Sequence, residues 1–350
     1  MRKVLYITNI EVPYRVKFFN SLSERTDLTV LYERNNSANR NSEWAKSVNA
    51  SYKKHFLEGL KISNENSFSF KIFKYLNGNY DDIIISCFNS PVQMMAILYL
   101  RLRGKKYILS FDGEQFIGES GLKNHLKKFF IKGADKYLVA GEKSAENIKK
   151  LVGDKEVFPY YFSSYTEEEL TKNQVDCQPR EKYVLVVGQY FDYKGLDIAL
   201  KVARLDRTIR YKFVGMGKRT KLFVKEQLFE EDTNIEVVPF LQKKDLITEY
   251  KKAGVLLLPS RKECWGLVIN EAASFGTPII STVGSGAAME FLRGEYEKYL
   301  FSIDDTIGIQ GAIHKLLTQE DGDYSRYLIE TGAHYSVEKM VEAHENALNV

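Results

Sequence analysis

Two glutamates in the segment ECWGLVINEAASFGTPII, residues 263–280, stand out as residues that could do chemistry. Glu263 and Glu271 bracket a stretch that is otherwise apolar enough for a protein core. Burying a carboxylate is costly unless a partner holds it. The two glutamates therefore either lie on the surface or bind a ligand.

The elements around the glutamates favour the ligand. The strand-like GVLLLP ends at residue 259, the polar loop SRKECWG follows, and LVINEAASF predicts a buried helix. The loop then lies at the carboxyl end of a parallel strand, where open α/β sheets bind ligands. Unpaired amides near Gly266, Leu267 and Val268 would suit a phosphate. Glu271 is placed to accept hydrogen bonds from a vicinal diol such as ribose, and Glu263 to reach a sugar ring.

A second segment, VVGQYFDYKGLDIAL, predicts the same kind of site. Lys194 and Gly195 begin a helix after the strand YVLVVG (183–188), and a lysine there can neutralise a diphosphate. A solvated lysine at a helix start is the alternative. GMGKRT, which begins at Gly215, resembles a dinucleotide fingerprint, but Thr220 stands where the third glycine should be. We therefore interpret it as a turn near the phosphates, with Lys218 and Arg219 as additional cations.

Short apolar runs alternate with helical patterns along the whole chain, which indicates parallel sheets covered on both faces. Strands are predicted at 3–8, 28–33, 82–86, 106–111 and 136–141, and again at 183–188, 211–215, 235–239, 254–259 and 278–282. The polar segment 164–181 has the composition of a linker. The sequence thus predicts two doubly wound α/β domains, with ranges 1–165 and 181–332, and a final segment 333–350 that packs back on the first domain.

The composition fits a globular protein of 350 residues, with 44% hydrophobic and 27% charged residues. Three cysteines, Cys87, Cys177 and Cys264, are too few and scattered for a disulfide framework or a zinc site. The start carries Glu11 and Arg15 and does not resemble a signal peptide. No segment reaches the roughly 18 apolar residues of a membrane-spanning helix. We therefore expect a cytoplasmic protein.

Basic residues are concentrated in the first part of the chain. Residues 1–150 hold 25 Lys and Arg against 15 Asp and Glu, whereas the rest holds 25 against 31. An anionic partner, membrane or nucleic acid, would explain this asymmetry. The segment 121–138 sets Leu122, Leu126, Phe129 and Phe130 on one helical stripe, with lysines beside it. It predicts a basic amphipathic helix at an anionic membrane surface, with a core-facing helix as the alternative.

Residues 183–317 resemble the family 4 glycosyltransferases, which have the GT-B fold. The resemblance rests on VVGQYFDYKGLDIAL, FVGMG, the long run from VPFLQKKDL to AAMEFL, and YLFSIDDTIGIQGAIHKLL. It implies two Rossmann-like domains that face a central cleft. The N-terminal YITNIEVPYRVKFFNSL resembles bacterial members that build surface and capsular polysaccharides.

In that family the second glutamate holds the ribose of a nucleotide-sugar, the first touches the donor sugar, and the lysine binds the diphosphate. These roles fall on Glu271, Glu263 and Lys194. The resemblance further implies retention of the anomeric configuration, no metal cofactor, and a UDP-hexose as the expected donor. It also implies a glycan acceptor linked to polyprenyl diphosphate at the inner face of the cell membrane, and no nucleic acid partner.

The sequence departs from the family at two places. An arginine usually follows the glycine of the first loop, whereas Gln189 follows Gly188 here. Many members also carry a histidine in an N-terminal loop that here reads LSFDGEQF, with Asp112 and Glu114. Asp112 either takes over a contact with a sugar hydroxyl or simply forms an Asp-Gly turn.

Three other functions are alternatives to sugar transfer. A sugar-nucleotide epimerase would need an acid and a base flanking one sugar carbon, and no such pair is marked in the sequence. A non-catalytic nucleotide-sugar-binding protein would be expected to lack Lys194 or Glu263, and both are present. A dehydrogenase is least expected because neither half opens with GxGxxG.

Overall fold

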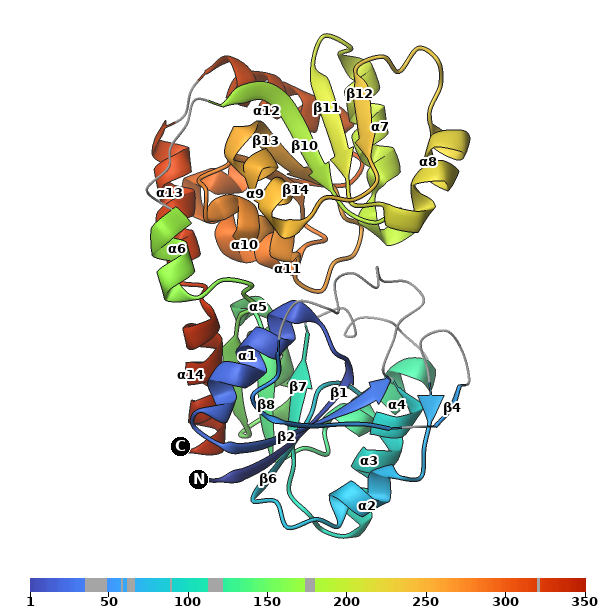
Figure 1. Cartoon of the computed structure of the whole chain (residues 1–350), viewed down its shortest axis with the longest axis vertical. Coiled ribbons are helices and arrows are strands. Elements are labelled where there is room, and N and C mark those ends of the chain that lie inside the picture. The colour runs from blue at the N-terminus through green and yellow to red at the C-terminus, as the bar shows by residue number, and fades with distance from the viewer. Residues whose placement is uncertain are drawn as a thin grey trace. The chain divides into compact units, whose positions relative to one another are not determined.

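The computed structural model describes residues 1–34, 49–57, 59–61, 67–88, 90–112, 122–173, 180–319 and 322–350. The chain forms two compact units. Unit 1 comprises Met1–Phe162 and Val337–Val350, and unit 2 comprises Ser163–Ser336. Each unit is built on one sheet with helices packed around it (Figure 1).

Unit 1 contains a seven-stranded sheet in the order β3-β2-β1-β6-β7-β8-β9, in which every neighbouring pair is parallel. Its strands are β1 (Lys3–Ile10), β2 (Asp27–Arg34), β3 (Lys53–Phe56), β6 (Asp82–Ile85), β7 (Ile108–Phe111), β8 (Lys136–Ala140) and β9 (Glu156–Tyr160). The short pair β4 (Leu60–Lys61) and β5 (Ser67–Phe68) is antiparallel. The order reverses between β1 and β6, which confirms a doubly wound sheet.

The five strands predicted for the first half are present as β1, β2, β6, β7 and β8, whereas β3 and β9 were not predicted. These two strands form the edges of the sheet. β3 has the sequence KKHF with exposed lysines, and β9 has the sequence EVFPY with Pro159. Edge strands tolerate charges and proline because one side of the strand needs no ladder partner. Neither therefore shows the apolar run that marks a central strand.

The helices of unit 1 are α1 (Pro13–Ser23), α2 (Ile72–Leu76), α3 (Pro91–Leu102), α4 (Leu122–Ile131), α5 (Glu142–Val152) and α14 (Val337–Leu348). Helix α14 brings the end of the chain back to this unit. Its His344 is fully buried, with ring centroids 4.6 Å from Phe18 and 5.2 Å from Tyr160. Burial lowers the pKa of His344 to about 4, so the ring is neutral at neutral pH.

Unit 2 contains a six-stranded parallel sheet in the order β12-β11-β10-β13-β14-β15. Its strands are β10 (Glu181–Val187), β11 (Arg210–Val214), β12 (Ile235–Val238), β13 (Ala253–Leu258), β14 (Ile279–Thr282) and β15 (Leu300–Phe301). Its helices are α6 (Glu167–Asn173), α7 (Leu196–Leu205), α8 (Thr220–Gln227), α9 (Lys243–Lys252), α10 (Leu267–Ala273), α11 (Gly286–Phe291), α12 (Thr306–Thr318) and α13 (Gly322–Ala333). Here the order reverses between β10 and β13. All five predicted strands are present, and among the described residues of this unit the two-residue β15 is the one additional strand.

The segment 164–181, which has the composition of a linker, contains a helix in the structure. Helix α6 occupies part of it and begins with a capping box. The backbone amide of Thr166 donates to Glu169 Oε2 at 2.8 Å, and the amide of Glu169 donates to Thr166 Oγ1 at 3.2 Å. Two amides at the helix start are thereby satisfied reciprocally. The T-x-x-E spacing of Thr166 and Glu169 is the sequence signal that marks this helix start. Residues 174–179, and Cys177 with them, lie outside the described residues.

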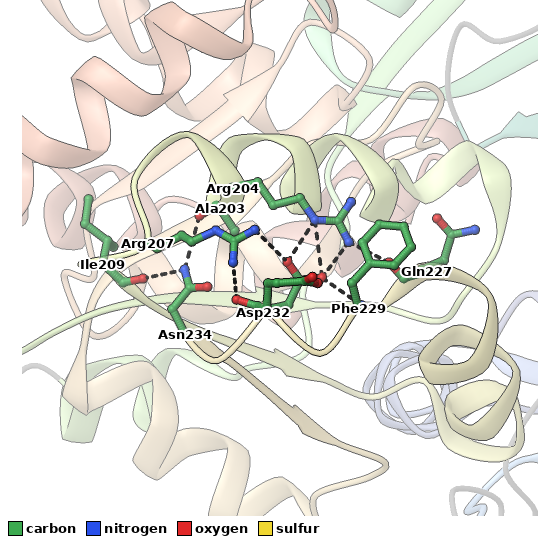
Figure 2. A network of polar contacts seen from close by, with 9 residues as sticks. Ala203, Arg204, Arg207, Ile209, Gln227, Phe229, Asp232 and Asn234 are labelled. Carbon is green, nitrogen blue, oxygen red and sulfur yellow. Dashed lines mark hydrogen bonds and ion pairs between the residues drawn. The ribbon is translucent and has the colours of Figure 1, made fainter.

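A polar network fixes the far end of α7 in unit 2 (Figure 2). Arg204 on α7 donates to Asp232 from Nε at 2.9 Å and from Nη2 at 2.6 Å, and also to the Gln227 carbonyl at 2.6 Å. Its guanidinium lies 4.7 Å from the Phe229 ring centroid. The hydrogen bond from Arg204 lowers the pKa of Asp232, whose side chain is 1% exposed. The network therefore anchors the helix whose start follows Lys194.

Candidate functional site

The candidate site lies at the carboxyl ends of β10 and β13, between which the order of the unit 2 sheet reverses. The loop after β10 passes through a 3₁₀ turn, Asp192–Lys194, into α7, and the loop after β13 leads into α10. Ligands of open α/β sheets bind in the crevice at such a reversal. Both segments singled out in the sequence thus follow the carboxyl ends of two neighbouring central strands of one sheet.

Lys194 and Glu263 contact each other directly. Lys194 Nζ donates to Glu263 Oε2, and the two side chains are 21% and 16% exposed. The sequence predicted that the lysine faces a diphosphate and the glutamate a sugar. In the structure the two groups neutralise one another, as opposite charges that lie close together and are largely shielded from water do. An anionic ligand that binds this lysine must therefore compete with Glu263.

Two glycines allow the loops to come this close. Gly195 has φ 67°, and a Cβ there would lie 1.9 Å from the Pro259 carbonyl oxygen. Gly266 has φ 101°, and a Cβ there would lie 2.8 Å from Ser285 Oγ. Any larger residue would push the loop after β13 away from α7 or from the 282–286 turn. Both glycines were singled out from the sequence, and the structure gives each a steric reason.

An arginine that the sequence reasoning missed ties the two loops together. Arg261 donates from Nη1 and Nη2 to the Asp197 carboxylate at 2.7 and 2.6 Å, and its backbone amide donates to the Tyr193 carbonyl at 2.9 Å. The hydrogen bond from Arg261 lowers the pKa of Asp197. This pair fixes the loop after β13 to the first turn of α7. The loops that carry Lys194 and Glu263 are thus connected by both the side chain and the backbone amide of Arg261, which keeps the two charged groups close together.

Glu271 lies on α10, half-buried, and both of its carboxylate oxygens have partners. Tyr250 Oη donates to Oε2 at 2.8 Å, and Ser164 Oγ donates to Oε1 at 3.1 Å. Burial raises the pKa of Glu271, and the two hydrogen bonds act in the opposite direction. Leu267 and Val268 form the first turn of the same helix. The predicted contacts of this helix start with phosphate, and of Glu271 with ribose, stay predictions.

Gly188 and Gly215, two of the other predicted phosphate contacts, lie close together at the loop after β10. The amide of Gly188 donates to the Val214 carbonyl at 2.9 Å, and a Cβ on Gly215, which has φ 95°, would lie 3.7 Å from the Gly188 nitrogen. The two glycines, and Gln189 after the first of them, are therefore close neighbours. Lys218 and Arg219 are both exposed.

Arg219 reaches the loop that carries Lys194. Its Nη1 donates to the Tyr190 carbonyl at 3.1 Å, and its guanidinium lies 4.0 Å from the Phe191 ring centroid. Of the two exposed cations, Arg219 is thus the one that the structure joins to the predicted phosphate loop.

Asp112 follows β7 in unit 1 and has a buried partner that the sequence reasoning missed. Arg15 donates from Nη2 to Asp112 Oδ2 at 2.8 Å, and Tyr160 Oη donates to Oδ1 at 3.3 Å. The side chains of Arg15 and Asp112 are 7% and 33% exposed. Asp112 is therefore held in place by more than an Asp-Gly turn. Glu114 lies outside the described residues.

Residues 167–335 match the family model of the glycosyl transferases, group 1. The match covers nearly all of unit 2, and with it the Lys194–Glu263 pair and Glu271. We refer to this part of the chain as the group 1 module.

Two curated bacterial proteins resemble parts of the chain. An uncharacterised 41.2 kDa protein in the cps region of Klebsiella pneumoniae is 31% identical over 111 residues, which are 31% of this chain and 30% of that protein. An uncharacterised glycosyltransferase of Haemophilus influenzae is 26% identical over 183 residues, 49% of this chain and 50% of that protein. The chain thus spans half or less of the length of these relatives.

Solved structures match the chain over its whole length. The structure of HepE from Anabaena, in complex with UDP and glucose, covers 100% of both chains with a TM-score of 0.70 at 13% identity. Sucrose-phosphate synthase from Thermosynechococcus elongatus covers 99% of this chain and 98% of its own, with a TM-score of 0.71 at 14% identity. At such low identity the likeness concerns the fold, which is GT-B.

Proposed function

We propose that the chain is a glycosyltransferase that moves a hexose-type sugar from a UDP-sugar to a hydroxyl of a glycan acceptor, with retention of the anomeric configuration. The observation that carries this proposal is the Lys194–Glu263 pair at the sheet reversal of a group 1 module. It offers one cation for a diphosphate and one carboxylate for a sugar that becomes positively charged.

The transfer breaks the bond between the anomeric carbon of the sugar and the adjoining phosphate oxygen. The electron pair leaves with the nucleoside diphosphate, and Lys194 stabilises the negative charge that grows there. Glu263 faces the positive charge on the oxocarbenium-like ring. The acceptor oxygen bonds to the anomeric carbon on the face that the phosphate leaves, and its proton passes to that phosphate. The reaction therefore needs no side chain as general base.

Two of the comparisons support the donor and the setting. A protein with the same fold forms a complex with UDP and glucose. A relative is encoded in a cps region. We propose a glycan acceptor linked to polyprenyl diphosphate, at the cytoplasmic face of the membrane, in the synthesis of a surface polysaccharide. Asp112 would accept a hydrogen bond from a sugar hydroxyl, and Arg219 would supply the cation that Gln189 does not.

We further propose that transfer requires no metal ion. Lys194 and the loop amides would offset the charge of the leaving diphosphate, which is the task that a divalent cation performs in other transferases. Within the described ranges, no three His, Cys, Asp or Glu side chains gather where they could hold a metal ion. The requirement is tested by chelation, as set out in the Discussion.

The membrane contact is proposed for α4 and the end of α3 in unit 1. The stripe predicted on α4 is divided, because Phe130 is buried while Leu126 and Phe129 are 53% and 46% exposed. The side chains of Leu122 and Lys123 lie outside the described residues. On α3, Leu102 is 86% exposed.

Cations flank these exposed apolar side chains. Arg101 lies 4.2 Å from the Phe129 ring centroid, and Lys132 is exposed just beyond α4. Apolar residues beside cations suit an anionic lipid interface. No helix in the described part of the chain is both long and apolar enough to cross a bilayer.

The proposed function is tested with a panel of nucleotide-sugars. Thermal shifts identify the donor, and transfer assays with that donor follow product formation with and without a glycan acceptor. Transfer that depends on the acceptor, with retention at the anomeric carbon by NMR, is the expected result. Isomerisation of the donor without acceptor would indicate an epimerase instead, and binding without any reaction would indicate a binding protein.

A further inference from the structure

The carboxylate of Glu271 is held on both sides by hydroxyl groups from distant parts of unit 2. Tyr250, near the end of α9, is 1% exposed and donates to Oε2, and Ser164, ahead of α6, is 8% exposed and donates to Oε1. A carboxylate offers about two acceptor positions on each oxygen. One hydroxyl on each oxygen therefore fixes the plane of the group and leaves one position on each oxygen for a ligand.

Tyr250 is itself held in place by contacts of its backbone and its ring. The backbone carbonyl of Tyr250 accepts a hydrogen bond from Thr277 Oγ1 at 2.6 Å and one from Arg180 Nη1 at 3.2 Å. Arg180 also donates from Nη2 to the Phe275 carbonyl at 2.6 Å, and the Phe275 ring stacks on the Tyr250 ring at 6.3 Å. These contacts join the end of α9 to the segment that follows α10. These contacts therefore hold α9, which carries the phenol, at a fixed distance from α10, which carries the carboxylate.

The phenol acts only as a donor in this contact. Burial, together with the charge of Glu271, raises the pKa of Tyr250 well above its ordinary value, so the hydroxyl keeps its proton. A hydrogen bond that is always donated to the same oxygen favours the ionised carboxylate and one orientation of it. An ionised, oriented carboxylate is what the recognition of two adjacent hydroxyls requires.

We infer that Tyr250 and Ser164 are positioning residues that orient the Glu271 carboxylate for the 2′- and 3′-hydroxyls of the nucleotide ribose. The inference rests on the proposed function, because it assumes that the ligand is a nucleoside diphosphate. Without the Tyr250 hydroxyl the carboxylate can rotate, and its two remaining acceptor positions no longer match a vicinal diol. Selectivity for ribose over deoxyribose should then fall more than affinity for the nucleotide as a whole.

The test compares UDP with 2′-deoxy-UDP by calorimetry on the full chain. A hydrogen bond to a charged group should give the wild type a preference for UDP of at least about tenfold. In Tyr250→Phe this preference should fall to about threefold or less, while the affinity for 2′-deoxy-UDP changes less than about twofold. Ser164→Ala should show the same loss of preference in a weaker form. It also provides a second variant should Tyr250→Phe fail to fold.

Tyr183→Phe is the matched control. Its phenol is also buried and donates to a carboxylate, Glu249 Oε2, at 2.8 Å. In the described part of the chain Tyr183 makes no hydrogen bond to Glu271, so this change leaves the hydroxyls that hold Glu271 in place. This variant should keep the wild-type preference. The inference is overturned if Tyr250→Phe keeps the preference, if both ligands weaken equally, or if the wild type binds UDP and 2′-deoxy-UDP alike. A wild type that binds no nucleoside diphosphate would instead overturn the proposed function, and the inference with it.

Discussion

Replacing Glu263 by glutamine should change ligand affinity and turnover in opposite directions. In the structure the Glu263 carboxylate is paired with Lys194, so a donor diphosphate has to displace it before it can take the lysine. Glu263→Gln keeps the shape of the side chain and removes its charge. The lysine is then available to the diphosphate, while the sugar loses the carboxylate that faces its growing positive charge.

The size of the effect follows from how far water reaches the pair. The two side chains are 16% and 21% exposed, so they are shielded more than an ordinary surface pair. Surface pairs contribute up to about 1 kcal/mol, and we take this upper value for Lys194–Glu263. Releasing the lysine should therefore strengthen the binding of free UDP by roughly fivefold. Turnover should fall by about 10²-fold, because the lost interaction acts in the transition state.

Calorimetry with UDP and a steady-state transfer assay measure the two effects separately. Lys194→Ala is the complementary variant, and it should weaken UDP binding and lower kcat by about 10²–10³-fold. Weaker UDP binding by Glu263→Gln would refute the competition between carboxylate and diphosphate. An unchanged kcat would remove Glu263 from the chemistry, even if the competition is real.

Four further predictions can be checked independently. Glu271→Ala should weaken UDP binding by about 1.5–3 kcal/mol, the range for a hydrogen bond to a charged group, and unchanged affinity in calorimetry would remove it from the nucleotide site. Transfer should survive EDTA, so a loss of activity that Mg²⁺ or Mn²⁺ restores would contradict metal independence. The double change Leu126→Glu and Phe129→Glu should abolish flotation with anionic vesicles at low salt, and wild-type protein that stays unbound there would refute the membrane surface. Asp232→Asn should lower the free energy of unfolding at pH 7 by about 2–3 kcal/mol in urea denaturation, because Arg204 loses its buried partner. Since the pKa of Asp232 is lowered in the folded state, the wild-type advantage should be present above its ordinary value of about 3.9 and disappear as the pH falls through the lowered value.

Sequence patterns predicted the central strands of both sheets because these strands are buried on both faces and form continuous apolar runs. β1 and β13 illustrate this, with fully buried residues along most of their length. The edge strands β3 and β9 were not predicted. One side of each strand needs no hydrogen-bonding partner, so these strands tolerate charged residues and proline and lack a continuous apolar run. Helix α6 escaped for another reason: its composition is polar, and only the capping spacing at Thr166 marked it.

At the candidate site the sequence identified individual residues but not their partners. Lys194 and Glu263 are 69 residues apart, and motif reasoning gave each a ligand contact rather than a contact with the other. Tyr250 and Ser164 lie 21 and 107 residues from Glu271 and carry no motif. Their hydroxyls reach the carboxylate only because β13 and α6 bring distant segments together. The spacing of residues along the sequence cannot predict such a contact.

The return of α14 to unit 1 has a consequence for the order in which the protein can be completed during synthesis. Unit 2 is one uninterrupted stretch of chain, whereas unit 1 needs the last helix to emerge from the ribosome. Until then Phe18 and Tyr160 lack the His344 ring that covers them. The part of unit 1 that precedes unit 2 in the chain therefore completes its core only after unit 2 and α14 have been translated. A chain that lacks α14 leaves the side chains beneath this helix exposed, which favours binding by chaperones and cleavage by proteases.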